Sequence, residues 1–373
     1  MVKILSTTKQ IQKFLGIEPL QSASIRVTMA CNLKCKHCYS IAGKKLNNEL
    51  SLGEIKKVVN ELKQLGAIRI FFTGGEPFIR PDILEILDYT DRNNFAIYIS
   101  TNGTLINQKI INSLKCLKHL KTFQISLDGV DKTHDSIRGI PGTFDKVINT
   151  IKLVKKELKN TKIAIISTLM KDNLDEIEKL FKLAIKFKID IFGLVTLYPV
   201  KRSAETEDVT TSQKYKLFQQ LSNIYKSYKS IKTKIGILVP PAIIPEPLKE
   251  IEFGCGYVCS FPSLLGINSN GDVAPCDGLL SYKEFILGNV RRDSLGKIYN
   301  HLLMRELRAI KSQDIKGVCR KCKYLSFCMG GCRARAFLEY RDWKAPNPLC
   351  QSFYKNNFFS KNNLIKRASK IKN

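Results

Sequence analysis

Residues 25–38 read IRVTMACNLKCKHC, a short run rich in β-branched residues followed at once by three cysteines. The run predicts a buried β-strand. Cys31, Cys35 and Cys38 follow it with the spacing C-x3-C-x2-C. Three thiolates can hold three irons of a [4Fe–4S] cube and leave the fourth iron open, whereas a structural zinc site requires four ligands. A zinc knuckle completed by His37 or a distant residue is the alternative.

Strand-like and helix-like segments alternate on the C-terminal side of this stretch. The runs that we expect to be strands are 25–29, 68–72, 96–100, 122–127, 162–168 and 191–197. Amphipathic segments lie between them; in one of these, 51–66, Ser51 and Glu54 form a capping box and Gly66 ends the helix. Such alternation predicts parallel βα units. We therefore expect an α/β fold, a partial (β/α)6 TIM-like barrel followed by a small cysteine-rich iron–sulfur domain.

Unusual residues directly follow the first four of these strands. The segments are CNLKCKHC, TGGEP, STNG and SLDG, and functional residues of such barrels lie at the carboxyl ends of strands. Together these motifs resemble the signature of the radical S-adenosylmethionine (SAM) superfamily. The resemblance implies that SAM chelates the open iron. One electron from the cluster then cleaves SAM to a 5′-deoxyadenosyl radical, which takes a hydrogen atom from the substrate.

The resemblance also implies a SAM-binding role for individual residues. They are His37 and Val195 near the adenine, Gly74, Gly75, Glu76 and Pro77 around the amino group, Ser100, Asn102, Ser126 and Asp128 at the ribose and methionine, and Arg138 at the carboxylate. Glycines allow close approach to a ligand, and a carboxylate pairs with an ammonium group. Turns or helix caps, a surface ion pair for Arg138 and core packing for Val195 are the structural alternatives.

A second group of cysteines lies between residues 255 and 350. Its spacing, with Gly271 in the turn GDVAPC, resembles the SPASM domain attached to many radical SAM enzymes. By position, that resemblance assigns Cys259, Cys276 and Cys332 to auxiliary cluster I and Cys319, Cys322, Cys328 and Cys350 to auxiliary cluster II. Cys255 precedes the pattern and could complete the ligands of cluster I. We therefore expect three [4Fe–4S] clusters. If Cys255 is not a ligand, an open iron of cluster I could bind substrate. Two four-cysteine zinc sites are the alternative to the auxiliary clusters.

Composition and length set the organisation that we expect. The chain has 373 residues and a formal net charge of +28. No apolar run could span a bilayer and the N-terminus lacks the features of a signal peptide, so we expect a cytoplasmic protein in which clustered cysteines bind metal. The remaining cysteine, Cys116, is expected to be buried in the core. The expected segments are an N-terminal extension (1–23), the barrel (24–198), a bridging helix and linker (199–254), the SPASM domain (255–352) and a basic tail (353–373).

The sequence leaves the substrate open. Asp277 directly follows Cys276 and resembles the base position of anaerobic sulfatase-maturating enzymes, although it could instead cap a turn. We expect a peptide or protein substrate. Residues 1–24 are too few for a recognition domain, so a leader would be bound by a separate protein or by the basic C-terminal region. A small molecule of tetrapyrrole or quinone cofactor biosynthesis is the alternative, and a non-enzymatic electron carrier is a third class. We expect flavodoxin or ferredoxin as the low-potential electron donor, and neither nucleic acid nor membrane as a partner.

Overall fold

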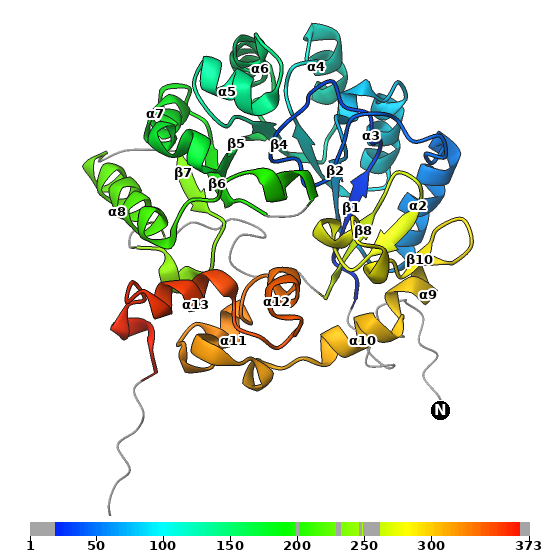
Figure 1. Cartoon of the computed structure of the whole chain (residues 1–373). Coiled ribbons are helices and arrows are strands. Elements are labelled where there is room, and N and C mark those ends of the chain that lie inside the picture. Colours follow the sequence, from blue (N-terminus) through cyan, green and yellow to red (C-terminus); the bar gives the residue numbers. More distant parts are fainter. Residues whose placement is uncertain (1–18, 199–200, 229–232, 246–247, 249–261, 366–373) are drawn as a thin grey trace, which may run out of the picture. The chain divides into compact units, whose positions relative to one another are not determined.

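The computed structural model describes residues 19–198, 201–228, 233–245, 248 and 262–365. The chain divides into two compact units (Figure 1). The first unit comprises Met1–Asp208, Lys232–Lys234 and Pro262–Arg305. The second comprises Val209–Ile231, Ile235–Phe261 and Glu306–Asn373.

The first unit is built on a twisted sheet whose central strands are parallel. These strands, each hydrogen-bonded to the next, are β1 (Ser22–Arg26), β2 (Arg69–Thr73), β3 (Ala96–Thr101), β4 (Leu120–Ser126), β5 (Lys162–Leu169) and β6 (Ile191–Thr196). All six strands expected from the sequence are present. The first strand begins three residues earlier than expected. It also ends three residues earlier, because the residues beyond Arg26 already lead into the cysteine loop.

The sheet continues on the other side of β1 with residues from much later in the chain. There β8 (Leu264–Ile267) pairs with β1 in parallel, and β9 (Asp272–Ala274) and β10 (Gly288–Asn289) follow as antiparallel strands. Within this unit the strand order is β10-β9-β8-β1-β2-β3-β4-β5-β6, which does not close on itself. The expected α/β architecture, a partial barrel, is confirmed.

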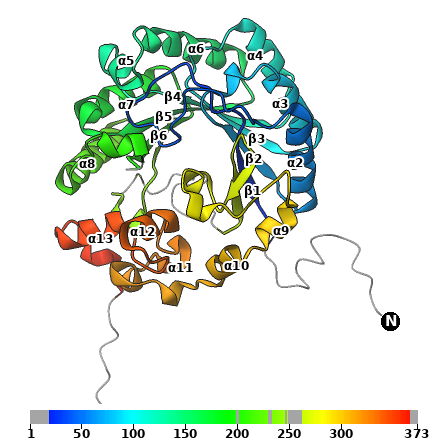
Figure 2. The ribbon, with the colours of Figure 1, turned by 45° about the vertical axis from the view of Figure 1, so that its right-hand side comes forward.

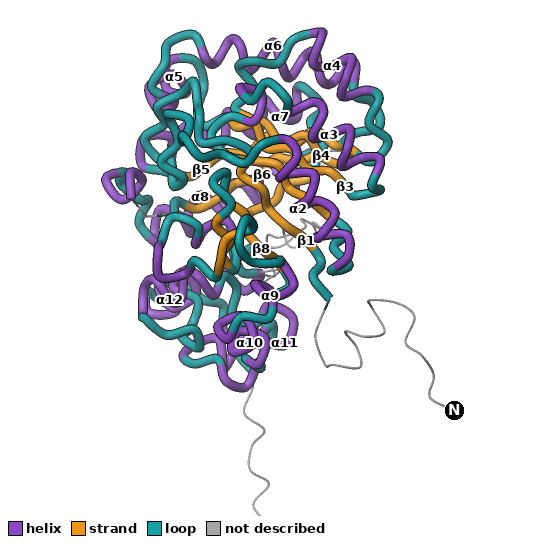
Figure 3. The backbone as a smooth tube through the Cα atoms, turned by 90° about the vertical axis from the view of Figure 1, so that its right-hand side faces the viewer, coloured by secondary structure: helices purple, strands orange, loops and turns teal. Residues whose placement is uncertain are grey.

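Helices between the parallel strands cover one side of this sheet (Figures 2 and 3). They are α2 (Leu52–Gln64), α3 (Ile83–Arg92), α4 (Gln108–Lys115), α5 (Lys132–Arg138), α6 (Thr143–Glu157) and α7 (Ile177–Lys186). The capping box predicted for Ser51 and Glu54 is present at the start of α2, and Gly66 follows its last turn with a positive φ. The apolar faces of the helices and strands form the core, which includes Val58, Leu62, Phe72, Phe123, Val147, Leu180 and Phe192.

The second unit is small and mostly helical. Its helices are α8 (Thr211–Ser227), α11 (Leu325–Cys328), α12 (Arg333–Tyr340) and α13 (Pro348–Lys355). Phe353 of α13 stacks on Phe218 of α8 with ring centroids 6.2 Å apart, and Thr211 and Ser352 are joined by a 2.6 Å hydrogen bond. These contacts hold α13, which carries Cys350, against α8.

The remaining elements are short. Helix α9 is Leu295–Tyr299, and α10 (Leu302–Ala309) and β7 (Lys234–Ile237) run across the boundaries between the units in the chain. Within the described ranges, no helix has the length and apolar character needed to cross a membrane.

Candidate active site and iron–sulfur ligands

The first three cysteines lie on the loop that leaves β1. Cys35 is buried, and Cys31 and Cys38 are half-buried. The loop is fixed at its start because the backbone N–H of Cys31 donates to Gly43 O at 2.9 Å, and Gly43 N–H donates to Met29 O. Burial raises the pKa of the Cys31 thiol to about 11 and also raises that of Cys35. Thiolates at this place therefore require a cationic centre, so this donor set fits an iron–sulfur cluster.

The glycines of the GGEP segment lie against the backbone that precedes this loop. Gly75 N–H donates to Thr28 O, and Glu76 N–H donates to Ala30 O, both at 2.8 Å. A Cβ at Gly75 would lie 2.1 Å from Ala30 O, and one at Gly74, where φ is +144°, would lie 2.3 Å from Thr28 O. Glycine is thus required here for close approach of two backbone segments.

Replacing Gly75 by alanine should therefore displace the cysteine loop. We expect Gly75→Ala to lower the free energy of unfolding by about 2 kcal/mol, as other overpacked sites do, and to lower the iron content of the reconstituted protein. Urea unfolding and iron analysis measure the two effects. Gly53→Ala is the matched control, because a Cβ there meets nothing within 4 Å. Equal behaviour of the two variants would show that the close approach does not hold the loop.

Glu76 is fully buried at the ends of β2 and β3. Its carboxylate accepts hydrogen bonds from Thr101 Oγ1 and Asn102 N, both at 2.7 Å, and from Phe78 N at 3.2 Å. Burial raises the pKa of Glu76 to about 7 in spite of these donors. Asn102 Nδ2 in turn donates to Oδ1 of Asn32, which lies between the first two cysteines. Glu76 thus ties the end of β3 to the cysteine loop.

Asp128 is a fully buried acidic group of this region. Its Oδ1 accepts from Thr168 N at 2.7 Å, and its Oδ2 lies 2.6 Å from Arg138 Nη2 and 3.4 Å from His37 Nε2. Burial acts to raise the pKa of Asp128, but Arg138, His37 and the Thr168 N–H outweigh it, so the pKa is lowered. Burial lowers the pKa of His37 to about 4, so this imidazole is neutral at pH 7.

The SAM-binding residues predicted from the sequence lie mainly at one edge of the sheet. His37 follows β1, Gly74–Pro77 follow β2, and Ser100 with Asn102 lies at the end of β3. Ser126 ends β4 and Asp128 follows it; Val195 is half-buried near the end of β6. Arg138 is the last residue of α5, and its Nη1 donates to Cys35 Sγ at 3.7 Å. Ser100 Oγ donates to Gln124 Oε1 at 2.8 Å.

An ion pair that sequence reasoning missed joins β1 to the candidate base Asp277. Arg26 is 1% exposed; its Nε donates to Asp277 Oδ1 at 2.8 Å, and its Nη2 donates to Asp277 Oδ2 at 3.2 Å and to Asp277 O at 2.8 Å. Tyr39, directly after Cys38, donates its hydroxyl to Asp277 Oδ2 at 2.6 Å. Burial raises the pKa of Tyr39, which keeps this hydroxyl protonated. The sequence signal was a lone arginine inside an apolar strand.

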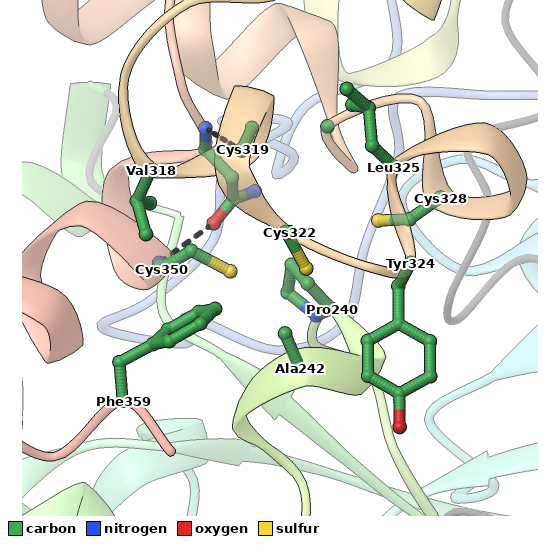
Figure 4. A pocket seen from close by; sticks show the side chains of 12 residues that line it. Pro240, Ala242, Val318, Cys319, Cys322, Tyr324, Leu325, Cys328, Cys350 and Phe359 are labelled. Atoms are coloured by element: carbon green, nitrogen blue, oxygen red, sulfur yellow. Dashed lines mark hydrogen bonds between the residues drawn. The ribbon is translucent and has the colours of Figure 1, made fainter. Parts of the chain in front are cut away.

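Four thiols of the second unit surround one cavity (Figure 4). They belong to Cys319, Cys322, Cys328 and Cys350, and the rest of the lining is mainly apolar, including Val318, Leu325 and Phe359. Asn347 N–H donates to Cys319 Sγ at 3.3 Å, while Asn347 Oδ1 accepts from Cys350 N. Burial raises the pKa of Cys328 to about 12 and that of Cys350 well above its usual value.

This arrangement fits an auxiliary cluster. Four thiols around a cavity provide the full ligand set of one [4Fe–4S] cube. In the described part of the chain, no three His, Cys, Asp or Glu side chains converge as ligands of a single metal ion. Asn347 supplies a hydrogen bond to one sulfur, the type of outer contact that orients metal ligands.

The other predicted auxiliary ligands are described only in part. Cys276 follows β9 and Cys332 precedes α12, both half-buried, whereas Cys255 and Cys259 lie outside the described residues. The expectation that Cys116 is a buried core thiol is wrong. Cys116 caps the end of α4, where Ile111 and Leu114 face the core, and its exposed Sγ donates to Asn112 O at 3.5 Å.

Comparison with known proteins identifies the domains that contain the first cysteine group and part of the second. Residues 25–184 match the Radical SAM superfamily, and residues 259–323 match SPASM, an iron–sulfur cluster-binding domain. An AdoMet-dependent heme synthase of Methanosarcina barkeri is 30% identical, over 87% of this chain and 94% of its own. Mycofactocin maturase MftC of Mycolicibacterium smegmatis is 27% identical, over 94% of this chain and 88% of its own. The structure of Streptococcus suis SuiB bound to precursor peptide SuiA has a TM-score of 0.71 at 21% identity, covering 92% of this chain and 79% of SuiB. This chain is therefore a member of the radical SAM superfamily with a SPASM domain.

Proposed function

We propose that this radical SAM enzyme cleaves SAM reductively and abstracts hydrogen from a peptide or protein, which is thereby oxidised, crosslinked or epimerised. The observation that carries the proposal is the cysteine loop. This loop follows β1 and carries three thiols at the edge of the sheet where the residues of the SAM motifs also lie. Cys31, Cys35 and Cys38 would hold the cluster that accepts SAM. When bound, that cluster supplies the electron for SAM cleavage.

The chain's own residues would bind SAM and exclude water from it. Hydroxyl and amide groups at the ends of β3 and β4 suit the ribose, and the glycine segment Gly74–Gly75 suits the amino acid part. Glu76 is fully buried and already accepts three hydrogen bonds, so it also fixes the strand ends around the ligand.

The second unit supports a transfer of electrons away from the reacting substrate. The four thiols of Cys319, Cys322, Cys328 and Cys350 would ligate auxiliary cluster II completely, which leaves no iron for substrate. Cys276 and Cys332, with Cys255 and Cys259, would hold auxiliary cluster I. We therefore infer three clusters in the working enzyme, of which the auxiliary pair transfers electrons. Flavodoxin or ferredoxin would be the low-potential electron donor.

Similarity to a maturase and the positive net charge are the two observations that support a peptide substrate. The mycofactocin maturase aligns with 94% of this chain, which includes both cysteine groups. A net charge of +28 also suits attraction of an acidic peptide or of an acidic leader-binding protein.

A tetrapyrrole side chain is the second candidate substrate. The specific observation in its favour is the AdoMet-dependent heme synthase, whose 30% identity extends over 94% of its own length. The same radical step would then act on a small molecule of cofactor biosynthesis.

Release of 5′-deoxyadenosine distinguishes these candidates. The anaerobically reconstituted enzyme is incubated with SAM, a strong reductant and host-cell extract separated by molecular size. Stimulation above the uncoupled background by the large fraction, lost after protease treatment, would support a peptide or protein substrate. Stimulation only by the small, protease-resistant fraction would reject it in favour of the tetrapyrrole or quinone precursors. A protein that releases no 5′-deoxyadenosine in any fraction would be a carrier and not an enzyme of this kind.

Asp277 is the base that we propose for the proton released during substrate oxidation. Arg26 and Tyr39 hold its carboxylate in one orientation through hydrogen bonds. We expect Asp277→Asn to retain the iron content and SAM cleavage while product formation falls by a factor of about 100 or more. Mass spectrometry of the substrate and chromatography of 5′-deoxyadenosine measure the two rates. Asp293→Asn, a change of the same kind at an ion pair with Lys297, is the control. Product at the normal rate in Asp277→Asn would make Asp277 only a structural residue.

A further inference from the structure

The end of helix α5 contacts the cysteine loop on both sides of Cys35. Lys34 N–H donates to Arg138 O and Lys36 N–H donates to Ile137 O, each at 3.0 Å. Gly139 ends the helix with φ +77°, and a Cβ there would lie 2.9 Å from Lys34 O. Two backbone hydrogen bonds and a tight glycine contact therefore set the position of Cys35 relative to Arg138.

The Arg138 side chain is fixed in the same place. Its Nη1 donates to Cys35 Sγ at 3.7 Å, and its Nη2 lies 2.6 Å from Asp128 Oδ2. Both side chains are removed from solvent, with 9% of Arg138 and none of Asp128 exposed. Arg138 Nε and Asp128 Oδ2 both have no hydrogen-bond partner among the described residues, so the 2.6 Å contact between the two side chains is an ion pair without hydrogen-bond geometry. A carboxylate bound in the bidentate manner needs two donor nitrogens along one edge, and here the terminal nitrogens already face Asp128 and Cys35.

Asp128 is itself rigidly held. Thr168 N donates to its Oδ1, and Asn173 Nδ2 donates to its backbone oxygen at 2.7 Å. Asp128 therefore does not turn toward a ligand without breaking buried hydrogen bonds, which is costly. Its Oδ2 also faces His37 Nε2, directly before Cys38 in the chain. One buried carboxylate thus orients groups next to two of the three loop cysteines.

We propose that Asp128 and Arg138 are a positioning pair for the loop cluster, in which Asp128 holds the Arg138 guanidinium against the Cys35 sulfur. The inference rests on the proposed role of Cys35 as a cluster ligand and departs from a role for Arg138 at the SAM carboxylate. Cluster potentials depend on the net charge, the hydrogen bonds to sulfur and the solvent exposure around them. A buried cation at a ligand sulfur stabilises the reduced, more negative cluster, because the low local dielectric strengthens the interaction.

The test is a redox titration of the reconstituted enzyme without SAM, in which electron paramagnetic resonance measures the reduced clusters at each potential. The loop cluster is identified as the signal that is lost when Cys31, Cys35 and Cys38 are alanine. We expect Arg138→Gln to keep this signal and its iron but to lower the midpoint potential. Arg138→Lys, which keeps the charge but cannot reach both partners, should restore only part of the shift. In Asp128→Asn, a potential lowered toward that of Arg138→Gln would support the anchoring role of Asp128. A raised potential, which loss of a negative charge alone would give, would reject that role.

Lys36→Gln is the matched control. It removes the same charge one residue from Cys35, but Lys36 is 48% exposed and paired with Asp172, so solvent screens it and its shift should be smaller. An unchanged potential in Arg138→Gln, with a raised KM for SAM, would overturn the proposal and place Arg138 at the SAM carboxylate. If the reconstituted wild-type enzyme shows no loop-cluster signal at all, the proposed function is rejected. Failure of the positioning role and failure of the proposed function are therefore distinguishable.

Discussion

Alanine at Cys31, Cys35 and Cys38 together is expected to abolish SAM cleavage and to remove about four of roughly twelve irons per chain, if each cubane cluster contains four. The three thiols lie on one loop at the edge of the sheet, and burial raises the pKa of two of them, so they need a cationic centre to ionise. Iron analysis and release of 5′-deoxyadenosine measure the two effects. The four thiols of the second unit line a cavity of their own, so the iron of the auxiliary clusters should be retained.

Cys116→Ala provides the control for this experiment. Cys116 is exposed at the end of α4, and its sulfur donates a hydrogen bond to Asn112 O in the same helix. Its removal should change neither iron content nor SAM cleavage. If the triple variant cleaves SAM at the wild-type rate, the assignment of the loop to the catalytic cluster is wrong.

Loss of the Arg26 side chain should have the largest effect on stability. In Arg26→Met the Asp277 carboxylate keeps the Tyr39 hydroxyl but loses its cationic partner, at a site where Arg26 is 1% and Asp277 is 16% exposed. Removing one member of a buried pair costs about 3 kcal/mol or more, because the remaining charge stays desolvated. We expect the free energy of unfolding to fall by about this amount, measured by urea unfolding of the anaerobic holoenzyme with circular dichroism.

The double variant Arg26→Met with Asp277→Asn shows whether the cost comes from the unpaired charge. It should be more stable than Arg26→Met alone, because its amide is neutral and still accepts from Tyr39. A double variant as unstable as the sum of the single variants would show that Arg26 acts through packing in β1. In that case the ion pair would not be what holds Asp277.

Local patterns were sufficient to predict the strands and the edge of the sheet where the site lies. Strand periodicity located β1 to β6 to within a few residues, and the polar residues after them lie at the carboxyl ends because the strands are parallel. The capping box of α2 was predicted because both partners lie three residues apart and need no tertiary contact.

Pairings between distant segments could not be predicted in this way. Nothing near Arg26 in the sequence indicates Asp277, because their contact depends on β8 lying beside β1. The motif SLDG shows a polar turn but not that Asp128 faces Arg138, which requires α5 to return to the same edge. The prediction that Cys116 is buried failed for a related reason. Its apolar neighbours Ile111 and Leu114 face the core, but α4 ends at Lys115, and the thiol of Cys116 faces solvent.

The place of β1 between β2 and β8 affects the order in which the chain can fold during synthesis. Ser22 pairs with Arg69 on one side and with Leu264 on the other, so its second neighbour leaves the ribosome only after most of the chain. Until then one edge of β1 has unpaired backbone groups that can associate with other chains. Contacts of such long sequence separation also form slowly. The cysteine loop that follows β1 gains Asp277 as a partner of Tyr39 only at that late stage. The backbone hydrogen bonds that hold the loop itself come from the first 140 residues, so the loop can form early, whereas the surroundings of Asp277 are completed only late in synthesis.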